Sequence, residues 1–281
     1  MLKQTHIQQY SDLRIVGGAP FPIRLSDTIV QEAKPEYLAR LQDLADTWQL
    51  QAWPKSAGVP AQGLLLSLSE NGLGLVDINQ PKVLPLMVDF ASDALAYRKD
   101  KGGGKNEAIA KAVGIKGQSH WHVVDATAGL GTDSFILASV GCQVTMLERA
   151  NVVCALLADG LARLAWRDDL VWLAEALSLK SGSAHESLQK LAQEAAHVDV
   201  VYLDPMFPHK KKSAAVKKNM QFLQQLLGHD TDADDLLTPA LALAHKRVVV
   251  KRPNYAPPLN NQAPSMAIKG KKHRFDVYLL Q

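Results

Sequence analysis

The sequence is poor in cysteine and contains no long apolar run, and each absence excludes a class of protein. Only Cys142 and Cys154 occur among 281 residues. Two cysteines are too few for a disulfide framework and lack the spacing of zinc ligands, so we expect a reducing cytoplasm and no metal. No stretch approaches 18 uninterrupted apolar residues, and residues 1–10 lack the apolar core of a signal peptide, so we expect neither a membrane span nor secretion.

Aromatic residues are also scarce, at 6% of the chain, whereas hydrophobic residues make up 47% and charged residues 21%. This is the composition of an ordinary globular protein, so disordered and fibrous architectures are excluded. The 31 basic and 28 acidic residues nearly cancel to a net charge of +3, so the total charge identifies no partner. The positions of the basic residues along the chain are more informative.

The first part of the chain differs in pattern from the rest, and we expect two domains, residues 1–95 and residues 96–281. In the first domain, two apolar runs flank Asn71-Gly72, a sequence typical of a hairpin turn. The elements expected there are a helix over 31–50, a hairpin over 63–79 and a strand over 84–90. Together they predict a small α+β domain.

In the second domain, short β-branched runs alternate with segments of helical period. This alternation predicts a mostly parallel sheet covered by helices on both faces. The expected strands are 122–126, 143–147, 177–180, 198–203 and 247–251, and the expected helices are 134–140, 152–166, 186–196, 214–227 and 235–245. Two further strands, 266–269 and 275–280, predict a C-terminal hairpin. This α/β arrangement resembles the Rossmann-like fold of class I methyltransferases that depend on S-adenosylmethionine (SAM).

The sharpest local signal is the loop expected between the first strand and first helix of this sheet, which contains Gly129 and Gly131. Two glycines there allow a tight turn and a close approach of the backbone to a ligand. Glu148 follows 17 residues after Gly131, at the expected end of the second strand. A carboxylate in that place can accept hydrogen bonds from both ribose hydroxyls of an adenosine.

Two cofactors compete for this pattern. A dinucleotide site requires a third glycine, where this sequence has Ser134, and a helix N-terminus that receives a pyrophosphate. SAM carries an ammonium group instead, which an acidic residue such as Asp125 or Asp133 can attract directly or through water. The sequence therefore favours SAM over a dinucleotide.

A second signal is Asp204-Pro205-Met206-Phe207, which directly follows an apolar strand. An exocyclic amine is a weak nucleophile because its lone pair is delocalised into the ring. The Asp204 carboxylate and the Pro205 carbonyl can accept its two hydrogens and orient the lone pair, while Phe207 stacks on the base. Methylation of pyrimidine C5 is excluded, because it requires a cysteine nucleophile and neither cysteine is near this motif.

Three clusters of basic residues occur in the same domain. A basic rim around an active site is suited to a phosphate backbone, whereas a small-molecule substrate needs none. A solvated charged surface is the alternative interpretation. The clusters are His209 to Lys212 with Lys217 and Lys218; Lys246, Arg247, Lys251 and Arg252; and Lys269, Lys271, Lys272, His273 and Arg274.

Together these motifs resemble a known family, the ribosomal RNA small-subunit methyltransferase J family, over about residues 97–278. The likeness rests on four strings: Asp125-Ala-Thr-Ala-Gly-Leu-Gly131, Met146-Leu-Glu-Arg149, Tyr202-Leu-Asp-Pro-Met-Phe-Pro-His-Lys210 and Val248-Val-Val-Lys-Arg-Pro253. Within the third string, the segment from Asp204 to Lys210 is specific. Met206 stands where amino-methyltransferases in general have a second proline.

The resemblance implies methylation of guanine N2 in small-subunit (16S) ribosomal RNA, either free or within a ribosomal particle, on a class I methyltransferase fold. It also implies SAM contacts at matching positions, among which Glu186 departs from the small polar residues usual in the family. The implied contact residues are Thr132, Asp133, Glu148, Arg149, Glu186, Ser187 and Asp204.

Two other functions remain open at this point. The same Asp-Pro motif serves adenine N-methyltransferases and methyltransferases that act on glutamine amides. Alternatively, the domain is an RNA-binding module that keeps the fold without catalysis, although its intact acidic and glycine positions argue against this.

Overall fold

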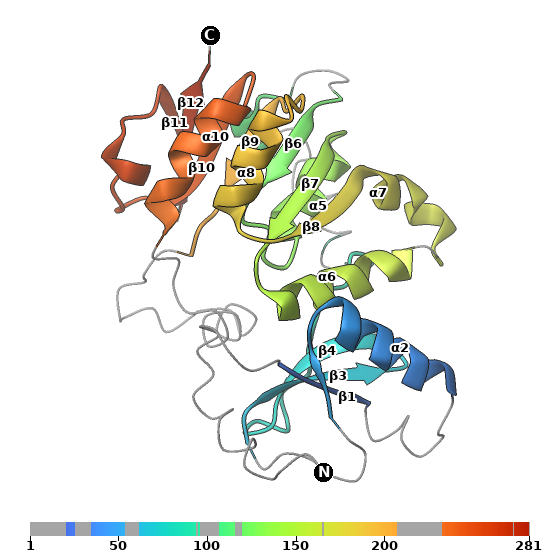
Figure 1. Cartoon of the computed structure of the whole chain (residues 1–281). Helices are drawn as coiled ribbons and strands as arrows, with labels where there is room; N and C mark the ends of the chain where they lie inside the picture. The colour runs from blue at the N-terminus through green and yellow to red at the C-terminus, as the bar shows by residue number, and fades with distance from the viewer. Residues whose placement is uncertain are drawn as a thin grey trace. The chain divides into compact units, whose positions relative to one another are not determined.

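The computed structural model describes residues 21–25, 35–53, 62–93, 95, 107–115, 120–164, 166–206, 232–271 and 273–280 (Figure 1). These residues form two compact units. The first unit contains the described residues up to Val88 together with Ala150–Gly160, and the second contains the remainder. The domain boundary expected between residues 95 and 96 stays a prediction.

The first unit is built on a five-stranded sheet with the order β2-β1-β3-β4-β5. The predicted hairpin is confirmed: β3 and β4 pair in antiparallel register from Leu64 opposite Asp77 to Ser69 opposite Gly72. The sheet also contains two short strands, β1 and β2, that the sequence did not predict. The elements of this unit are β1 (Pro22–Leu25), α2 (Pro35–Thr47), β2 (Gln51–Ala52), β3 (Leu64–Ser69), β4 (Gly72–Asp77) and β5 (Leu86–Met87).

The beginning of helix α6 (Asn151–Leu164) also belongs to the first unit. Its Asp159 is buried, accepts a hydrogen bond from the Leu73 N–H at 3.0 Å, and forms an ion pair with Arg40 of α2. Gly160 lies directly against Val88, and a Cβ atom at this position would approach a Val88 side-chain carbon to 2.7 Å. The part of α6 up to Gly160 is therefore fitted to the other elements of the first unit.

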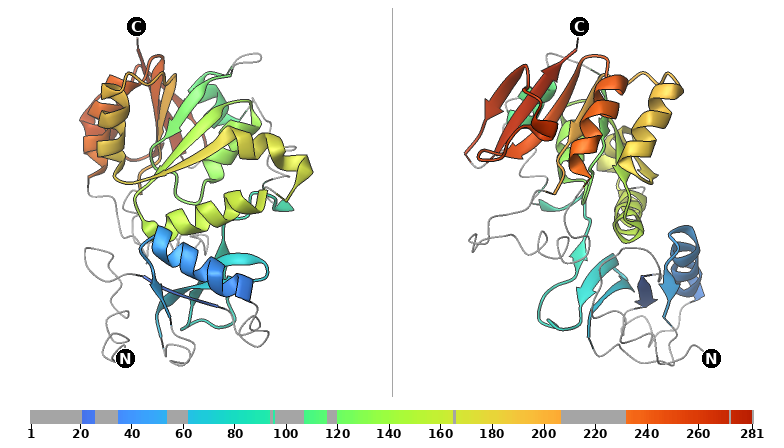
Figure 2. Two further views of the ribbon diagram at one scale, coloured as in Figure 1. Left: turned by 45° about the vertical axis from the view of Figure 1, so that its right-hand side comes forward. Right: turned by 60° about the vertical axis from the view of Figure 1, so that its left-hand side comes forward.

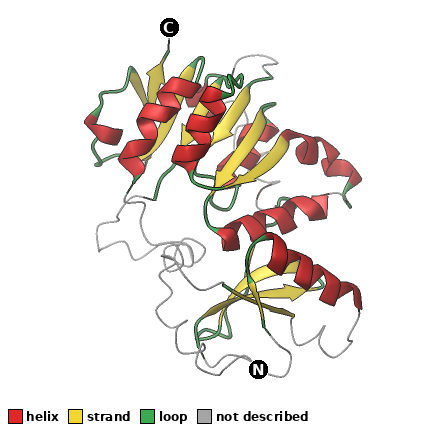
Figure 3. Ribbon diagram, viewed as in Figure 1, coloured by secondary structure: helices red, strands yellow, loops and turns green. Residues whose placement is uncertain are grey.

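The second unit is built on a seven-stranded sheet with the order β11-β12-β10-β9-β6-β7-β8 (Figure 3). Strands β6 to β10 are parallel to one another, and β12 is antiparallel to both of its neighbours. This order and the closing hairpin confirm the predicted class I methyltransferase fold. The strands are β6 (His122–Asp125), β7 (Gln143–Glu148), β8 (Leu177–Ser181), β9 (Val200–Leu203), β10 (Arg247–Pro253), β11 (Met266–Lys269) and β12 (His273–Leu279).

Helices cover both faces of this sheet. Because crossovers between parallel strands are right-handed, the helix between β6 and β7 lies on the opposite face from those between β8 and β9 and between β9 and β10. Accordingly, α8 and α10 pack side by side on one face (Figures 1 and 2). The helical elements are α4 (Ala108–Val113), α5 (Thr132–Ser139), η4 (Asp168–Leu170), α7 (Val171–Ala176), α8 (Ala184–Gln193), η5 (Ala233–Leu236), α10 (Leu237–Leu243) and η6 (Leu259–Asn261).

Most of the predicted elements are found within a few residues of their expected ends. Helix α7 was not predicted, and the helix expected over 214–227 lies outside the described residues. In the described part of the chain, every helix is too short or too polar to cross a membrane.

The direction of strand addition reverses between β6 and β9, which lie side by side with Asp125 opposite Tyr202. From β6 the chain moves outward to β7 and β8, and it then returns to place β9 and β10 on the other side of β6. The loops that follow β6 and β9 therefore leave the sheet together at its carboxyl edge. In open α/β sheets this is where ligands bind.

Candidate active site

The loop after β6 has the backbone conformation that its glycines predict. Gly129 and Gly131 have φ values of +52° and +71°, in the left-handed region that favours glycine. The Gly131 N–H donates to the Ala128 carbonyl at 2.8 Å, and Gly131 then caps the N-terminus of α5. A Cβ atom at Gly129 would meet no other atom within 4 Å, so this loop presents bare backbone toward open space.

Glu148 ends strand β7 and holds the glycine loop in place. Its side chain is buried, and its Oε2 accepts a hydrogen bond from the Gly129 N–H at 3.1 Å. The Ala128 N–H donates to the Leu147 carbonyl at 3.2 Å, which fixes the loop to the same strand. The acidic residue and the glycine loop that the sequence placed in one site are therefore in direct contact.

Asp125, the last residue of β6, shapes the loop from inside. It is 1% exposed, and its two oxygens accept hydrogen bonds from the Thr127 N–H at 3.2 Å and the Ser134 Oγ at 2.5 Å. Burial raises the pKa of the Asp125 carboxyl to about 7, and the Ser134 hydrogen bond only partly opposes this rise.

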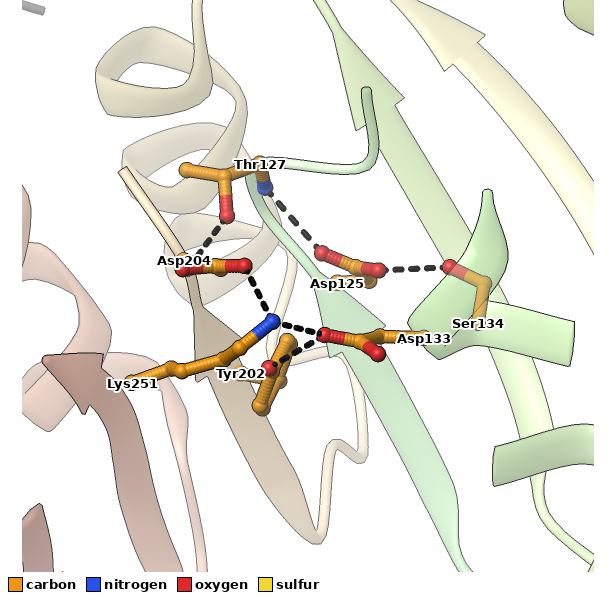
Figure 4. A network of polar contacts seen from close by, with 7 residues as sticks. All are labelled: Asp125, Thr127, Asp133, Ser134, Tyr202, Asp204 and Lys251. Carbon is orange, nitrogen blue, oxygen red and sulfur yellow. Dashed lines mark hydrogen bonds and ion pairs between the residues drawn. The ribbon is translucent and has the colours of Figure 1, made fainter. Parts of the chain in front are cut away.

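Asp133 and Asp204 are brought together by a lysine that lies between them (Figure 4). The Lys251 Nζ is 2.8 Å from Asp133 Oδ2 and 2.7 Å from Asp204 Oδ2. Asp133 Oδ2 also accepts a hydrogen bond from the hydroxyl of Tyr202 at 2.8 Å. These contacts join the first turn of α5 to the ends of β9 and β10.

Asp204 is connected to the glycine loop by a second contact. Its backbone N–H donates to Thr127 Oγ1 at 2.5 Å. Burial raises the pKa of Asp204, and the ammonium of Lys251 opposes that rise. The loops after β6 and β9 are therefore cross-linked through both the backbone and the side chain of Asp204.

The remaining predicted residues lie around this centre or outside the described part of the chain. Arg149 follows Glu148 directly, and its side chain is exposed and pairs with Asp232 at 2.9 Å. Thr132 is the exposed first residue of α5, Pro205 is buried next to Asp204, and Phe207 lies outside the described residues.

Glu186 and Ser187 are in the first turn of α8, which follows the strand next to Glu148. The Ser183 side chain caps this helix by accepting from the Glu186 N–H at 3.5 Å. The Gly182 N–H donates to the Glu148 carbonyl at 2.9 Å. The residues that lead into α8 therefore lie beside the end of β7.

The sequence did not identify four residues of this network as site residues: Thr127, Ser134, Tyr202 and Lys251. Tyr202 lies inside the apolar run of β9, where burial is expected but a polar partner is not. Lys251 had one usable signal, because it follows the apolar residues of β10, whose Val250 is in register with Leu203. The lysine therefore had to lie beside Asp204 at the carboxyl edge.

The predicted basic rim is smaller than expected. Lys251 belongs to the network described above, and Arg252 is 3% exposed and donates to the Pro257 carbonyl. Arg274 is also buried and pairs with Asp276 at 2.7 Å. All three side chains are partnered, and those of Arg252 and Arg274 are also buried, so they hold neighbouring loops and are not available as a phosphate-binding surface.

The prediction that Lys246 and Arg247 belong to the rim was also wrong. They lie at the start of β10 and therefore at the amino edge of the sheet. Lys246 pairs with Asp199 at 3.2 Å, and Arg247 donates to the Ala112 carbonyl at the end of α4. Lys269 and Lys271 remain exposed at the carboxyl edge. The cluster from His209 to Lys218 and Lys272 lie outside the described residues.

The charges at this site fit SAM better than a dinucleotide. Asp125, Asp133 and Asp204 converge at the carboxyl edge, and among the described residues Lys251 is the cation that contacts two of them. Asp133 stands in the first turn of α5, where it would repel a pyrophosphate. The sulfonium and ammonium groups of SAM suit such an acidic site, and the open face of Gly129 beside Glu148 suits its adenosine.

The strand order, the glycine loop and the three aspartates at the carboxyl edge define a class I SAM-dependent methyltransferase. A family model described as "Putative SAM-dependent methyltransferase" matches residues 43–280. A crystal structure of a SAM-dependent methyltransferase from Neisseria gonorrhoeae is 36% identical, with a TM-score of 0.71 over 92% of this chain and 95% of that chain.

Curated relatives identify the family more closely. The ribosomal RNA small subunit methyltransferase J of Pseudoalteromonas atlantica is 55% identical over 90% of this chain and 98% of its own length. The protein of that name from Alteromonas mediterranea is 53% identical over 90% of this chain and 96% of its own. The chain belongs to the ribosomal RNA small subunit methyltransferase J family.

Proposed function

We propose that this protein transfers a methyl group from SAM to the exocyclic N2 amine of a guanine in small-subunit ribosomal RNA. The proposal depends above all on Asp204, which lies at the carboxyl edge of the sheet. Its backbone N–H is joined to the glycine loop through Thr127, and its carboxylate is held by Lys251. The names of the curated relatives support the RNA substrate. The identity of the methylated atom follows from the family resemblance.

The base-binding residues are proposed to be Asp204, Pro205 and Phe207. Lys251 donates to Oδ2 of Asp204, so Oδ1 is the oxygen we assign to the amine of the base. The Pro205 carbonyl accepts the second amine hydrogen, and the lone pair of nitrogen then points away from both acceptors. The aromatic ring of Phe207 stacks on the base, which must be extruded if the target is paired or stacked.

The cofactor residues are proposed to be those around the glycine loop. When bound, SAM supplies an electrophilic methyl group on a positively charged sulfur. The backbone at Gly129 and Gly131 contacts the cofactor, and the Glu148 carboxylate accepts hydrogen bonds from the ribose hydroxyls. Asp125 keeps the loop in shape from inside through Thr127 and Ser134.

The flanking residues complete the proposed cofactor site. Thr132 and Asp133 begin the helix after the loop, and the negative charge of Asp133 attracts a cationic ligand. Arg149 contributes through its backbone, because its side chain is paired with Asp232. Glu186 and Ser187 contact the cofactor from the start of α8.

We assign RNA backbone binding to Lys269 and Lys271. In the sheet, Lys269 of β11 is in register with Arg274 of β12, and Arg274 is in register with Arg252 of β10. The turn between β11 and β12 therefore lies at the carboxyl edge. Both lysines are exposed, and Asp276 is the only acidic residue of the sequence after Asp235. This part of the edge therefore offers positive charge to phosphates.

Transfer of tritium from labelled SAM tests the proposed function. The purified protein is incubated with small-subunit ribosomal RNA, intact small subunits, DNA or a protein extract. Label on guanine N2 of the RNA or of the subunit supports the proposal, whereas label on adenine or on glutamine contradicts it in favour of the other amino-methyltransferases. Failure of the protein to bind SAM at all contradicts it in favour of a non-catalytic RNA-binding module.

A further inference from the structure

Lys251 lies in the last part of strand β10, and the fold places it beside Asp204 in the loop after β9, although the sequence pattern grouped it with surface charges. The side chain of Lys251 is 24% exposed, and its Nζ contacts one oxygen of Asp133 and one of Asp204. Tyr202 supports the same arrangement by donating to Asp133 (Figure 4). We propose that Lys251 is a positioning residue, which orients the Asp204 carboxylate toward the amine and keeps it ionised. This inference rests on the proposed function.

Two contacts of Asp204, one at its backbone and one at its side chain, determine the position of its carboxylate. At the backbone, the N–H of Asp204 is held by Thr127 Oγ1 at 2.5 Å. At the side chain, Oδ2 is held by the Lys251 Nζ at 2.7 Å. With both ends fixed, rotation about the side-chain bonds is restricted, and Oδ1 is presented in one direction. Within the described residues, Lys251 is the side chain that supplies this second point of attachment.

Electrostatics also favours a fixed cation at this place. Asp133 and Asp204 both carry negative charge at the same edge, and without a cation between them their repulsion would favour protonation of one carboxyl. A protonated Asp204 could still donate a hydrogen bond, but it would lose much of its strength as an acceptor for the amine. Lys251 therefore preserves the acceptor that the proposed reaction requires.

Lys251 is not suited to remove the proton from the methylated amine. Burial lowers the pKa of Lys251, but the nearby carboxylates of Asp204 and Asp133 outweigh this effect and raise it. The side chain is therefore an ammonium throughout the physiological pH range and has no lone pair to offer. Its part in the reaction is exerted through Asp204.

Substitution of Lys251 tests this role, and Lys246 offers a matched control. Both lysines pair with an aspartate, but Lys246 immediately precedes β10 and pairs with Asp199 at the opposite edge of the sheet, whereas Lys251 lies within β10 near its carboxyl end. For Lys251→Met we expect kcat to fall roughly 10- to 100-fold, the effect of losing one charge-assisted hydrogen bond. The acidic limb of its pH–rate profile should move to higher pH, whereas Lys246→Met should leave both properties as in the wild type.

A second measurement needs neither cofactor nor substrate. NMR titration of the aspartate carboxyl carbons in the cofactor-free protein should show a higher pKa for Asp204 in Lys251→Met than in the wild type. Lys251→Arg retains the positive charge and should restore much of the difference. An Asp204 pKa that is the same in the wild type, Lys251→Met and Lys251→Arg would overturn the proposal. Because this titration is independent of RNA, its result distinguishes failure of this inference from failure of the proposed methyl transfer.

Discussion

The buried carboxyl of Asp125 makes the stability of this protein depend on pH in a way that one substitution should remove. In the unfolded chain Asp125 ionises near its ordinary value of 3.8, whereas in the folded protein burial holds its pKa at about 7. Between these values the folded state binds more protons than the unfolded state. Stability contributed by this group is therefore lost as the pH rises toward 7.

The size of the effect follows from the two pKa values. Each tenfold change in proton affinity is worth about 1.4 kcal/mol, so ionised Asp125 costs the folded state about 4 kcal/mol relative to the protonated form. About 3 kcal/mol of this change falls between pH 5 and pH 8. Asp125→Asn removes the charge but keeps an acceptor for the Thr127 N–H and a partner for the Ser134 hydroxyl.

The assay is denaturant unfolding of the wild type and Asp125→Asn at several pH values from 5 to 8. We expect the free energy of unfolding of the variant, relative to the wild type, to rise by about 3 kcal/mol across this range. Ser134→Ala provides a second test. Removal of its hydrogen bond raises the Asp125 pKa further, so the loss of stability should occur at higher pH than in the wild type. Parallel curves for the wild type and Asp125→Asn would refute the reasoning.

Three further predictions concern other parts of the second unit. Glu148→Ala should weaken SAM binding about tenfold, or about 1.4 kcal/mol, and calorimetry showing no loss would contradict its ribose role. Gly114→Ala should lower the free energy of unfolding by about 1–2 kcal/mol, because φ at this position is +86°; a loss below about 0.5 kcal/mol in urea unfolding would be inconsistent with this left-handed backbone. Lys269→Gln combined with Lys271→Gln should reduce the slope of log affinity for RNA against log salt by about 1.4–1.8, and a slope equal to that of the wild type would exclude these lysines from the RNA contact.

The order of the elements in the second unit could be predicted from the sequence because each carries its own periodicity. The β-branched runs near Val123, Val200 and Val248 are fully buried in the sheet, so their near-continuous apolar character identified them as central parallel strands. The hairpin at β3 and β4 was equally clear from Asn71-Gly72, although the turn itself consists of Glu70 and Asn71 and Gly72 is the first residue of β4. In such segments the local pattern and the tertiary environment require the same structure.

Strands β1 and β2 could not be predicted in this way. They have four and two residues, too few to show a period, and they exist because neighbouring strands supply their hydrogen bonds. Helix α7 has six residues and follows a turn of 3-10 helix, so it is likewise defined by its surroundings. Short elements of this kind depend on tertiary contacts for most of their stability.

The polar network of the candidate site was only partly predictable. Asp204 and the glycine loop each have a local signature, so the sequence alone predicts that both belong to the site. The assignment of Lys251, Arg252 and Arg274 to a basic rim was wrong, because the number of charges in a segment does not show which of them are paired. Successive side chains of a strand point to opposite faces of the sheet, and the register of the strands decides which partners each of them meets.

The central claim is that Asp204 directs methyl transfer to guanine N2, and it is tested most directly in cells that lack this protein. Small-subunit ribosomal RNA from such cells, supplied with the wild-type gene or with Asp204→Ala, is digested and its methylated guanines are mapped by mass spectrometry. We predict that one N2-methylguanosine is missing without the protein, returns with the wild type and stays missing with Asp204→Ala. Full methylation in cells that contain only Asp204→Ala would contradict the account.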